Sequence, residues 1–86
     1  MPEISRFYGI IIYIYTKDHN PPHIHAKYAG EYSEISIDTG KVIEGNLPPT
    51  AKRLVKRWVE LHKDELFANW EIAQQSQTPF KITPLK

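Results

Sequence analysis

The chain has 86 residues, with 11 lysines and arginines against 10 aspartates and glutamates, so its formal net charge is +1. This length fits one domain with a modest core, and the near-zero charge means that any case for a nucleic-acid partner must depend on local clusters of cations. The absence of cysteine excludes disulfides, thiolate metal sites and a cysteine nucleophile.

No segment predicts a membrane anchor. The longest apolar run, 10–15, is too short to cross a bilayer, and the amino terminus lacks a basic region followed by a long apolar stretch. We therefore expect a cytoplasmic protein. We also expect one α+β domain over residues 1–76, followed by an extended tail over residues 77–86.

The first half of the chain predicts a sheet. Residues 9–15 are β-branched and aromatic, and the prolines that follow require a loop, because proline cannot donate to a strand ladder. Beyond that loop, polar and apolar residues alternate on both sides of an Ala29-Gly30 turn. We predict four strands in an antiparallel meander, at 9–15, 23–28, 31–37 and 42–43.

The alternation of the two central strands also predicts their register. A tight turn at Ala29-Gly30 pairs Tyr28 with Glu31 and His25 with Glu34. Side chains alternate along a strand, so each face collects its own set. The predicted core face holds Ile24, Ala26, Ser33, Ile35 and Ile37. The opposite face holds His23, His25, Lys27, Tyr32, Glu34 and Ser36.

The second half predicts two helices packed on the core face of the sheet. Asn46 is a candidate capping residue ahead of two prolines, which a first helical turn tolerates. The two apolar stripes differ in phase, which predicts a break at 62–64, with Asp64 as a cap for the second helix. The first stripe contains Leu54, Val55, Trp58, Val59 and Leu61. The second contains Leu66, Phe67, Trp70 and Ala73, and both tryptophans are expected in the core.

Cations recur at helical spacing along one side of the first helix. They are Lys52, Arg53, Lys56 and Arg57. This stripe could follow the phosphate backbone of RNA, or it could be an ordinary solvated face, since acidic residues follow closely.

The strand at 9–15 is apolar on both faces, although the helices cover only one. Ile11, Tyr13 and Tyr15 therefore need a cover on the other face. The tail, a small protein partner or a second copy of the chain in a homodimer could provide it.

Three of the four histidines fall within seven positions, beside two prolines. His23 and His25 lie two apart on one predicted strand, so their rings share a face, and Glu34 lies opposite His25. This arrangement predicts a metal-independent ribonuclease in which the two histidines act as acid and base and Glu34 orients a ring. Lys27 or Arg6 would stabilise charge on the phosphorus.

Two other interpretations use the same residues. Neutral imidazoles from His19, His23 and His25 could hold zinc or a similar ion, with Asp18 as an alternative loop ligand and Glu34 as a fourth ligand or a supporting group. Alternatively, the histidines line an interface of a non-enzymatic interaction or regulatory module. No cofactor is expected under the first and third interpretations.

The chain also resembles a known family, and the residues that carry the likeness span most of it. They are Pro2-Glu3-Ile4-Ser5-Arg6-Phe7, the string Asp18-His19-Asn20-Pro21-Pro22-His23 with His25, and the later Trp58, His62, Leu66, Asn69 and Trp70. Similar short bacterial proteins are described as a domain of unknown function, and they are often predicted beside a small partner in toxin–antitoxin-like gene pairs. The resemblance implies a toxin-like or stress-related module with a small protein partner.

Overall fold

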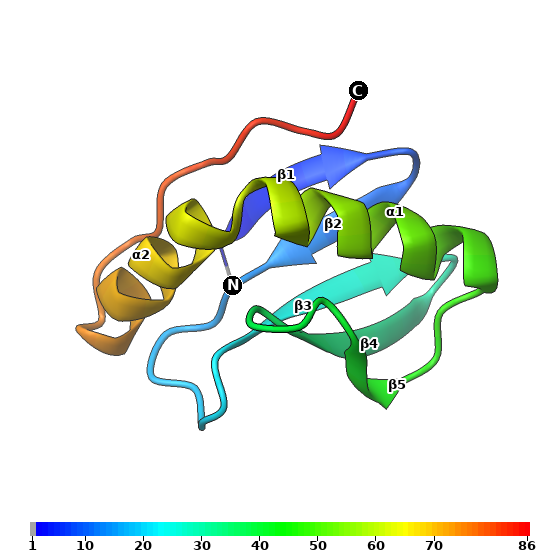
Figure 1. Ribbon diagram of the computed structural model, residues 1–86. Helices are drawn as coiled ribbons and strands as arrows, with labels where there is room; N and C mark the ends of the chain where they lie inside the picture. The colour runs from blue at the N-terminus through cyan, green and yellow to red at the C-terminus, as the bar shows by residue number, and fades with distance from the viewer. Residues whose placement is uncertain (1) are drawn as a thin grey trace.

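The computed structural model describes residues 2–86 and contains a five-stranded antiparallel sheet followed by two helices (Figure 1). The strands are β1 (Glu3–Phe7), β2 (Ile10–Tyr13), β3 (His23–Tyr28), β4 (Glu31–Ser36) and β5 (Val42–Gly45). They lie side by side in chain order, so short connections are enough to link them. The α+β class and the meander are confirmed, with one strand more than predicted.

The additional strand is β1, which pairs with β2 through a tight turn that places Phe7 opposite Ile10. The pairing is irregular between Glu3 and Ser5, and both Ile4 and Ser5 are buried. Two successive inward side chains remove the polar–apolar alternation by which a strand is recognised. The prediction of four strands is therefore wrong at this position.

The predicted register of β3 and β4 is confirmed, including the pairing of His25 with Glu34 and of Tyr28 with Glu31. Ala29 and Gly30 both have positive φ, at 51° and 81°, as a type I′ hairpin turn requires. All five residues of the predicted core face are buried.

The helices are α1 (Pro49–Leu61) and α2 (Lys63–Gln74), and the predicted break between them is confirmed at His62. The predicted caps are wrong, because neither helix has a side-chain cap and Asp64 lies inside the first turn of α2. Leu61 is also wrongly placed in the apolar stripe, since it is 58% exposed. It lies about 100° around the helix from the centre of the buried side.

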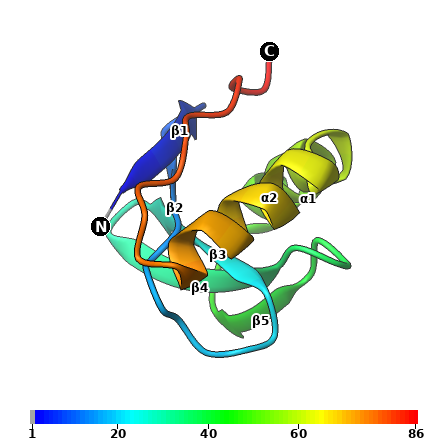
Figure 2. The ribbon, with the colours of Figure 1, turned by 90° about the vertical axis from the view of Figure 1, so that its left-hand side faces the viewer.

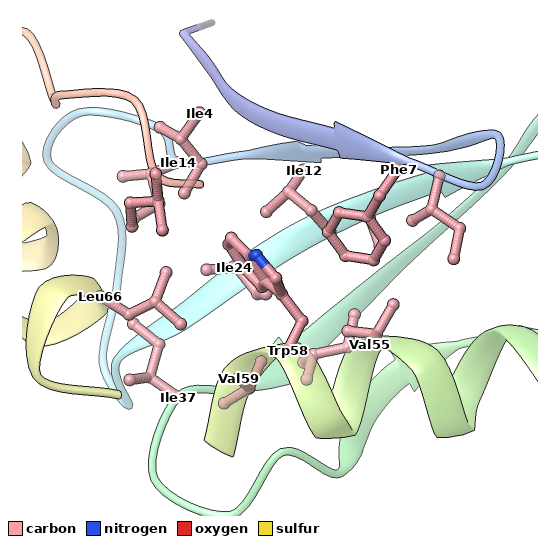
Figure 3. Packing of buried hydrophobic residues seen from close by; sticks show 14 of the residues in the cluster. Ile4, Phe7, Ile12, Ile14, Ile24, Ile37, Val55, Trp58, Val59 and Leu66 are labelled. Carbon is pink, nitrogen blue, oxygen red and sulfur yellow. The ribbon is translucent and has the colours of Figure 1, made fainter. Parts of the chain in front are cut away.

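Both helices cover the same face of the sheet (Figure 2), and the core lies between these two layers (Figure 3). Trp58 is fully buried, with its ring centroid 5.3 Å from that of Phe7, and Trp70 is 5% exposed, so both tryptophans lie in the core as predicted. No helix among residues 2–86 combines the length and the apolar character that crossing a membrane requires.

Residues 77–86 contain no helix or strand and run from the end of α2 past β1 (Figure 2). The backbone N–H of Ile82 donates to the carbonyl of Ile4 at 2.8 Å, and Ile82 belongs to the buried cluster. The indole N–H of Trp58 donates to the carbonyl of Thr83 at 2.9 Å. The tail is therefore fixed to the sheet edge and to α1.

Candidate metal centre

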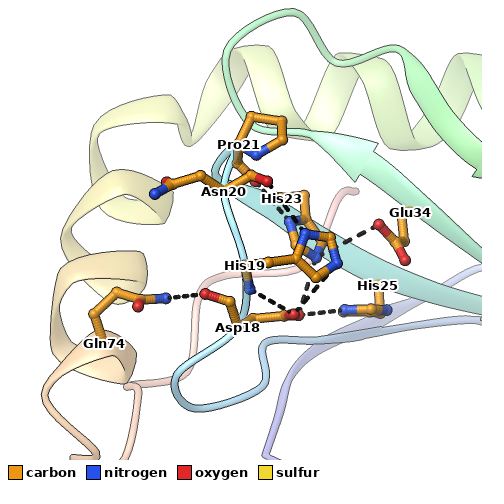
Figure 4. A network of polar contacts seen from close by, with 8 residues as sticks. All are labelled: Asp18, His19, Asn20, Pro21, His23, His25, Glu34 and Gln74. Carbon is orange, nitrogen blue, oxygen red and sulfur yellow. Dashed lines mark hydrogen bonds and ion pairs between the residues drawn. The ribbon is translucent and has the colours of Figure 1, made fainter.

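Two histidines and two carboxylates converge where the loop between β2 and β3 reaches the sheet (Figure 4). Asp18 lies on this loop, His23 and His25 are the first and third residues of β3, and Glu34 lies on the neighbouring strand β4. His23 and His25 project toward the same region because they are two residues apart on a strand. Their ring centroids are 4.9 Å apart.

The last turn of α2 holds the loop in place. The backbone N–H of Lys17 donates to the carbonyl of Ala73 at 3.0 Å. The side-chain amide of Gln74 donates to the carbonyl of Asp18 at 3.1 Å (Figure 4). The position of Asp18 therefore depends on the last turn of α2, more than fifty residues further along the chain.

One carboxylate oxygen faces both rings of the pair. Oδ2 of Asp18 lies 2.9 Å from Nε2 of His23 and 2.9 Å from Nε2 of His25. Oε1 of Glu34 lies 3.6 Å from Nε2 of His23. Glu34 is opposite His25 in the backbone register, as predicted, but the carboxylate that bonds to His25 belongs to Asp18.

His23 was predicted on the sheet face that the helices leave uncovered. This prediction is wrong as regards its exposure, because only 1% of the surface of His23 is exposed. The ring of Trp70 packs from α2, with the two ring centroids 5.3 Å apart. The side chain of His25 keeps 12% of its surface exposed. It also stacks on Tyr15, with centroids 4.0 Å apart and an interplanar angle of 21°.

Backbone carbonyls determine the tautomers of two histidines. Nδ1 of His23 lies 2.7 Å from the carbonyl oxygen of Pro21, and Nδ1 of His19 lies 3.2 Å from that of Asn20. A carbonyl oxygen only accepts, so each Nδ1 carries the proton and each neutral ring has a lone pair on Nε2. Histidines that bind metals have this arrangement, with the second ring nitrogen fixed by a carbonyl or a carboxylate.

The Nε2 atom of His23 is buried and has no hydrogen-bond partner among residues 2–86, although Asp18 is close. The 2.9 Å contact between them is not aligned as a hydrogen bond. Nε2 of a neutral ring and a carboxylate oxygen both carry negative charge, so they repel at this distance, and burial strengthens the repulsion. A cation between them would convert the repulsion into attraction.

The ligand atoms have separations that suit a small metal ion. The ligand atoms of Asp18, His23 and His25 all lie within 4.8 Å of one another, as do those of His19, His23 and Glu34. Tetrahedral bonds of about 2.1 Å to zinc place ligand atoms about 3.4 Å apart. The distances of 2.9 and 3.6 Å at His23 lie on either side of this value.

The three histidines do not form one ligand group in the part of the chain that the structure describes. His19 shares a group with His23 and Glu34, whereas His25 shares one with His23 and Asp18. The side chain of His19 is 68% exposed on the loop, and its hydrogen bond to the Asn20 carbonyl raises its pKa.

The carboxyl group of Asp18 is held in its ionised form. Burial raises its pKa, but the hydrogen bonds that it accepts from the His25 ring and the His19 backbone lower it. The resulting pKa lies below the ordinary value for aspartate. Asp18 is therefore anionic at neutral pH.

A pocket of about 290 Å³ adjoins the cluster on the uncovered face of the sheet. Its lining includes His25, Tyr32 and Glu34. Nζ of Lys27 lies on the same face, 5.5 Å from the centroid of the Tyr32 ring. Exogenous ligands can therefore reach one side of the cluster.

The four predicted helical cations are all exposed on α1 and lie outside the cluster. They are Lys52, Arg53, Lys56 and Arg57. Lys27, the fifth predicted nucleic-acid contact, was expected on the strand at 23–28 and lies on β3. The predicted nucleic-acid contacts therefore lie on two surfaces, one on α1 and the other on β3.

A family model described as a domain of unknown function (DUF4160) matches residues 9–71, which include the whole cluster. No curated protein and no solved structure matches the chain.

Proposed function

Because this chain belongs to the DUF4160 family of domains of unknown function, we propose its function from the geometry of the cluster, as a binding domain for a divalent transition-metal ion such as zinc. Asp18, His23 and His25 are the inner ligands, and His19 or Glu34 completes the coordination. Imidazole and carboxylate donors suit zinc, nickel, copper and cobalt, whereas calcium and magnesium prefer oxygen ligands alone.

The observation that supports this proposal most strongly is the buried Nε2 atom of His23. It lies 2.9 Å from Oδ2 of Asp18, but the direction in which its lone pair projects does not point at that oxygen, and the carbonyl of Pro21 holds the ring proton on Nδ1. Protonation of the ring would also relieve the repulsion, but a proton on Nε2 would not point along this contact. An ion that draws both atoms toward a common point accounts for the misalignment.

Metal titration of chelator-treated, untagged protein tests the proposal. Calorimetry is expected to find one zinc ion per chain, and His25→Ala is expected to weaken binding by at least about tenfold. His62→Ala is the matched control, because His62 pairs with Glu65 on the helical side and lies outside both ligand groups. Substoichiometric binding, or equal loss in the two variants, would exclude the site.

The metal-independent ribonuclease, in the toxin-like role that the resemblance implies, is a second proposal. It is favoured by the 2.9 Å contact between Asp18 and the partly exposed His25, which is the pairing that orients a general base. The burial of His23 counts against its direct contact with a substrate. RNA cleavage in excess chelator that disappears in His25→Ala would support this activity, and the absence of cleavage would exclude it.

A protein partner or a homodimer on the uncovered sheet face is also a proposal. Ile11, Tyr13 and Tyr15 are only partly buried. Sedimentation of the purified chain, alone and with the product of the neighbouring gene, measures whether this face is occupied in solution.

A further inference from the structure

The turn between β4 and β5 packs against α1 and forms a groove on the helical side of the molecule. One pocket of about 320 Å³ lies between the turn and the helix, and a second depression continues it along α1. Arg53 and Lys56 border both. We call the two together the basic groove, and its cations are Lys41, Lys52, Arg53, Lys56 and Arg57.

Within the described part of the chain, these cations have no counterions. The ion pairs and side-chain hydrogen bonds found across residues 2–86 involve none of their five charged groups. Glu60 is the one acidic residue that borders the groove. The first turn of α1 has no acidic residue to neutralise the positive end of the helix dipole. The dipole therefore adds to the positive potential of the groove. Like charges at this spacing repel, and a bound anion would relieve that repulsion.

Tertiary packing makes the groove, because the helix alone supplies only four of the cations. Gly40 has a φ of +74°, and a Cβ atom at this position would lie 3.0 Å from Cγ of Lys56. Without that atom, the turn approaches α1 closely and brings Lys41 beside Lys52. The stripe predicted from helical spacing did not include Lys41.

From these observations we infer that the basic groove binds the phosphodiester backbone of a nucleic acid. Two adjoining depressions that share cations can hold more than one phosphate, which suits a polymer better than a single small anion. The apolar lining is Val42 and Leu54 and includes no aromatic ring, so there is no surface for base stacking. Recognition is therefore electrostatic and independent of sequence, and it does not depend on the proposed metal site.

Fluorescence anisotropy with a labelled single-stranded RNA tests this inference across a range of salt concentrations. Three to five phosphate contacts predict a slope of log K against log salt of about −2 to −3.5. Lys52→Gln combined with Lys56→Gln is expected to make the slope shallower by about 1.4 and to weaken binding about tenfold at low salt. Two RNAs of unrelated sequence should bind within about twofold of each other.

The matched control is Lys81→Gln combined with Lys86→Gln, which removes the same charge from exposed positions on the tail, outside the basic groove. It should keep the wild-type slope, and adding zinc to the wild-type protein should leave that slope unchanged. Equal loss in both double variants, an unchanged slope in Lys52→Gln/Lys56→Gln, or no binding at low salt would overturn the inference. Displacement by a mononucleotide or by polyglutamate as effective as displacement by unlabelled RNA would also overturn it.

Discussion

Zinc is expected to raise the melting temperature of the protein by about 15 °C when its free concentration is 100 times Kd. A ligand at this concentration stabilises the folded state by about 2.7 kcal/mol. A chain of 86 residues has an unfolding entropy of about 0.18 kcal/mol/K, which converts that energy into the stated shift. Circular dichroism melts of chelator-treated protein, with and without zinc, measure it.

The zinc-induced shift in melting temperature, measured in variants, shows whether zinc binds at this cluster. If loss of a ligand in His25→Ala weakens binding about 100-fold, the same zinc concentration stabilises by only about 0.4 kcal/mol, or about 2 °C. His62→Ala should retain the full shift, and magnesium should produce none. A wild-type shift below about 2 °C, or a full shift in His25→Ala, would refute binding at this cluster.

Two further predictions concern stability. In urea unfolding, Gly40→Ala should cost about 1 kcal/mol more than Gly30→Ala, because both have positive φ but only a Cβ atom at Gly40 would crowd Lys56, at 3.0 Å; equal costs would contradict this. Asn69→Leu should cost about 2–4 kcal/mol, because the buried Asn69 amide donates to the Phe80 carbonyl at 2.8 Å and accepts from its N–H at 2.9 Å. Unchanged hydrogen exchange at Phe80 would show that this pair does not hold the tail.

The central hairpin could be predicted because two strands carry independent alternating patterns that meet at one turn. Ile24 and Ile35 indicate the same register, and a shift by one residue would expose both. The strand β1 could not be found in this way, since Ile4 and Ser5 both turn inward. Local patterns thus predict an element where pleating is regular and fail where it is not.

The candidate site, like the fold, could be predicted only where it depends on local strand alternation. Strand alternation brings His23 and His25 together, but it does not reveal that Trp70 covers one ring or that Asp18 bonds to the other. Both facts depend on α2, which packs against the loop from far along the chain. Lys41 was missed for a similar reason, because its approach to α1 depends on a turn with no helical periodicity.

The hydrogen bond from Gln74 to Asp18 joins residues 56 positions apart, so it forms only when the two halves of the chain have come together. Until α2 has docked, the loop that carries Asp18 lacks this anchor. We therefore expect a captured ion to leave the refolding rate nearly unchanged and to slow unfolding instead. The lifetime of the native state, more than the speed of reaching it, would then follow the supply of metal in the cell.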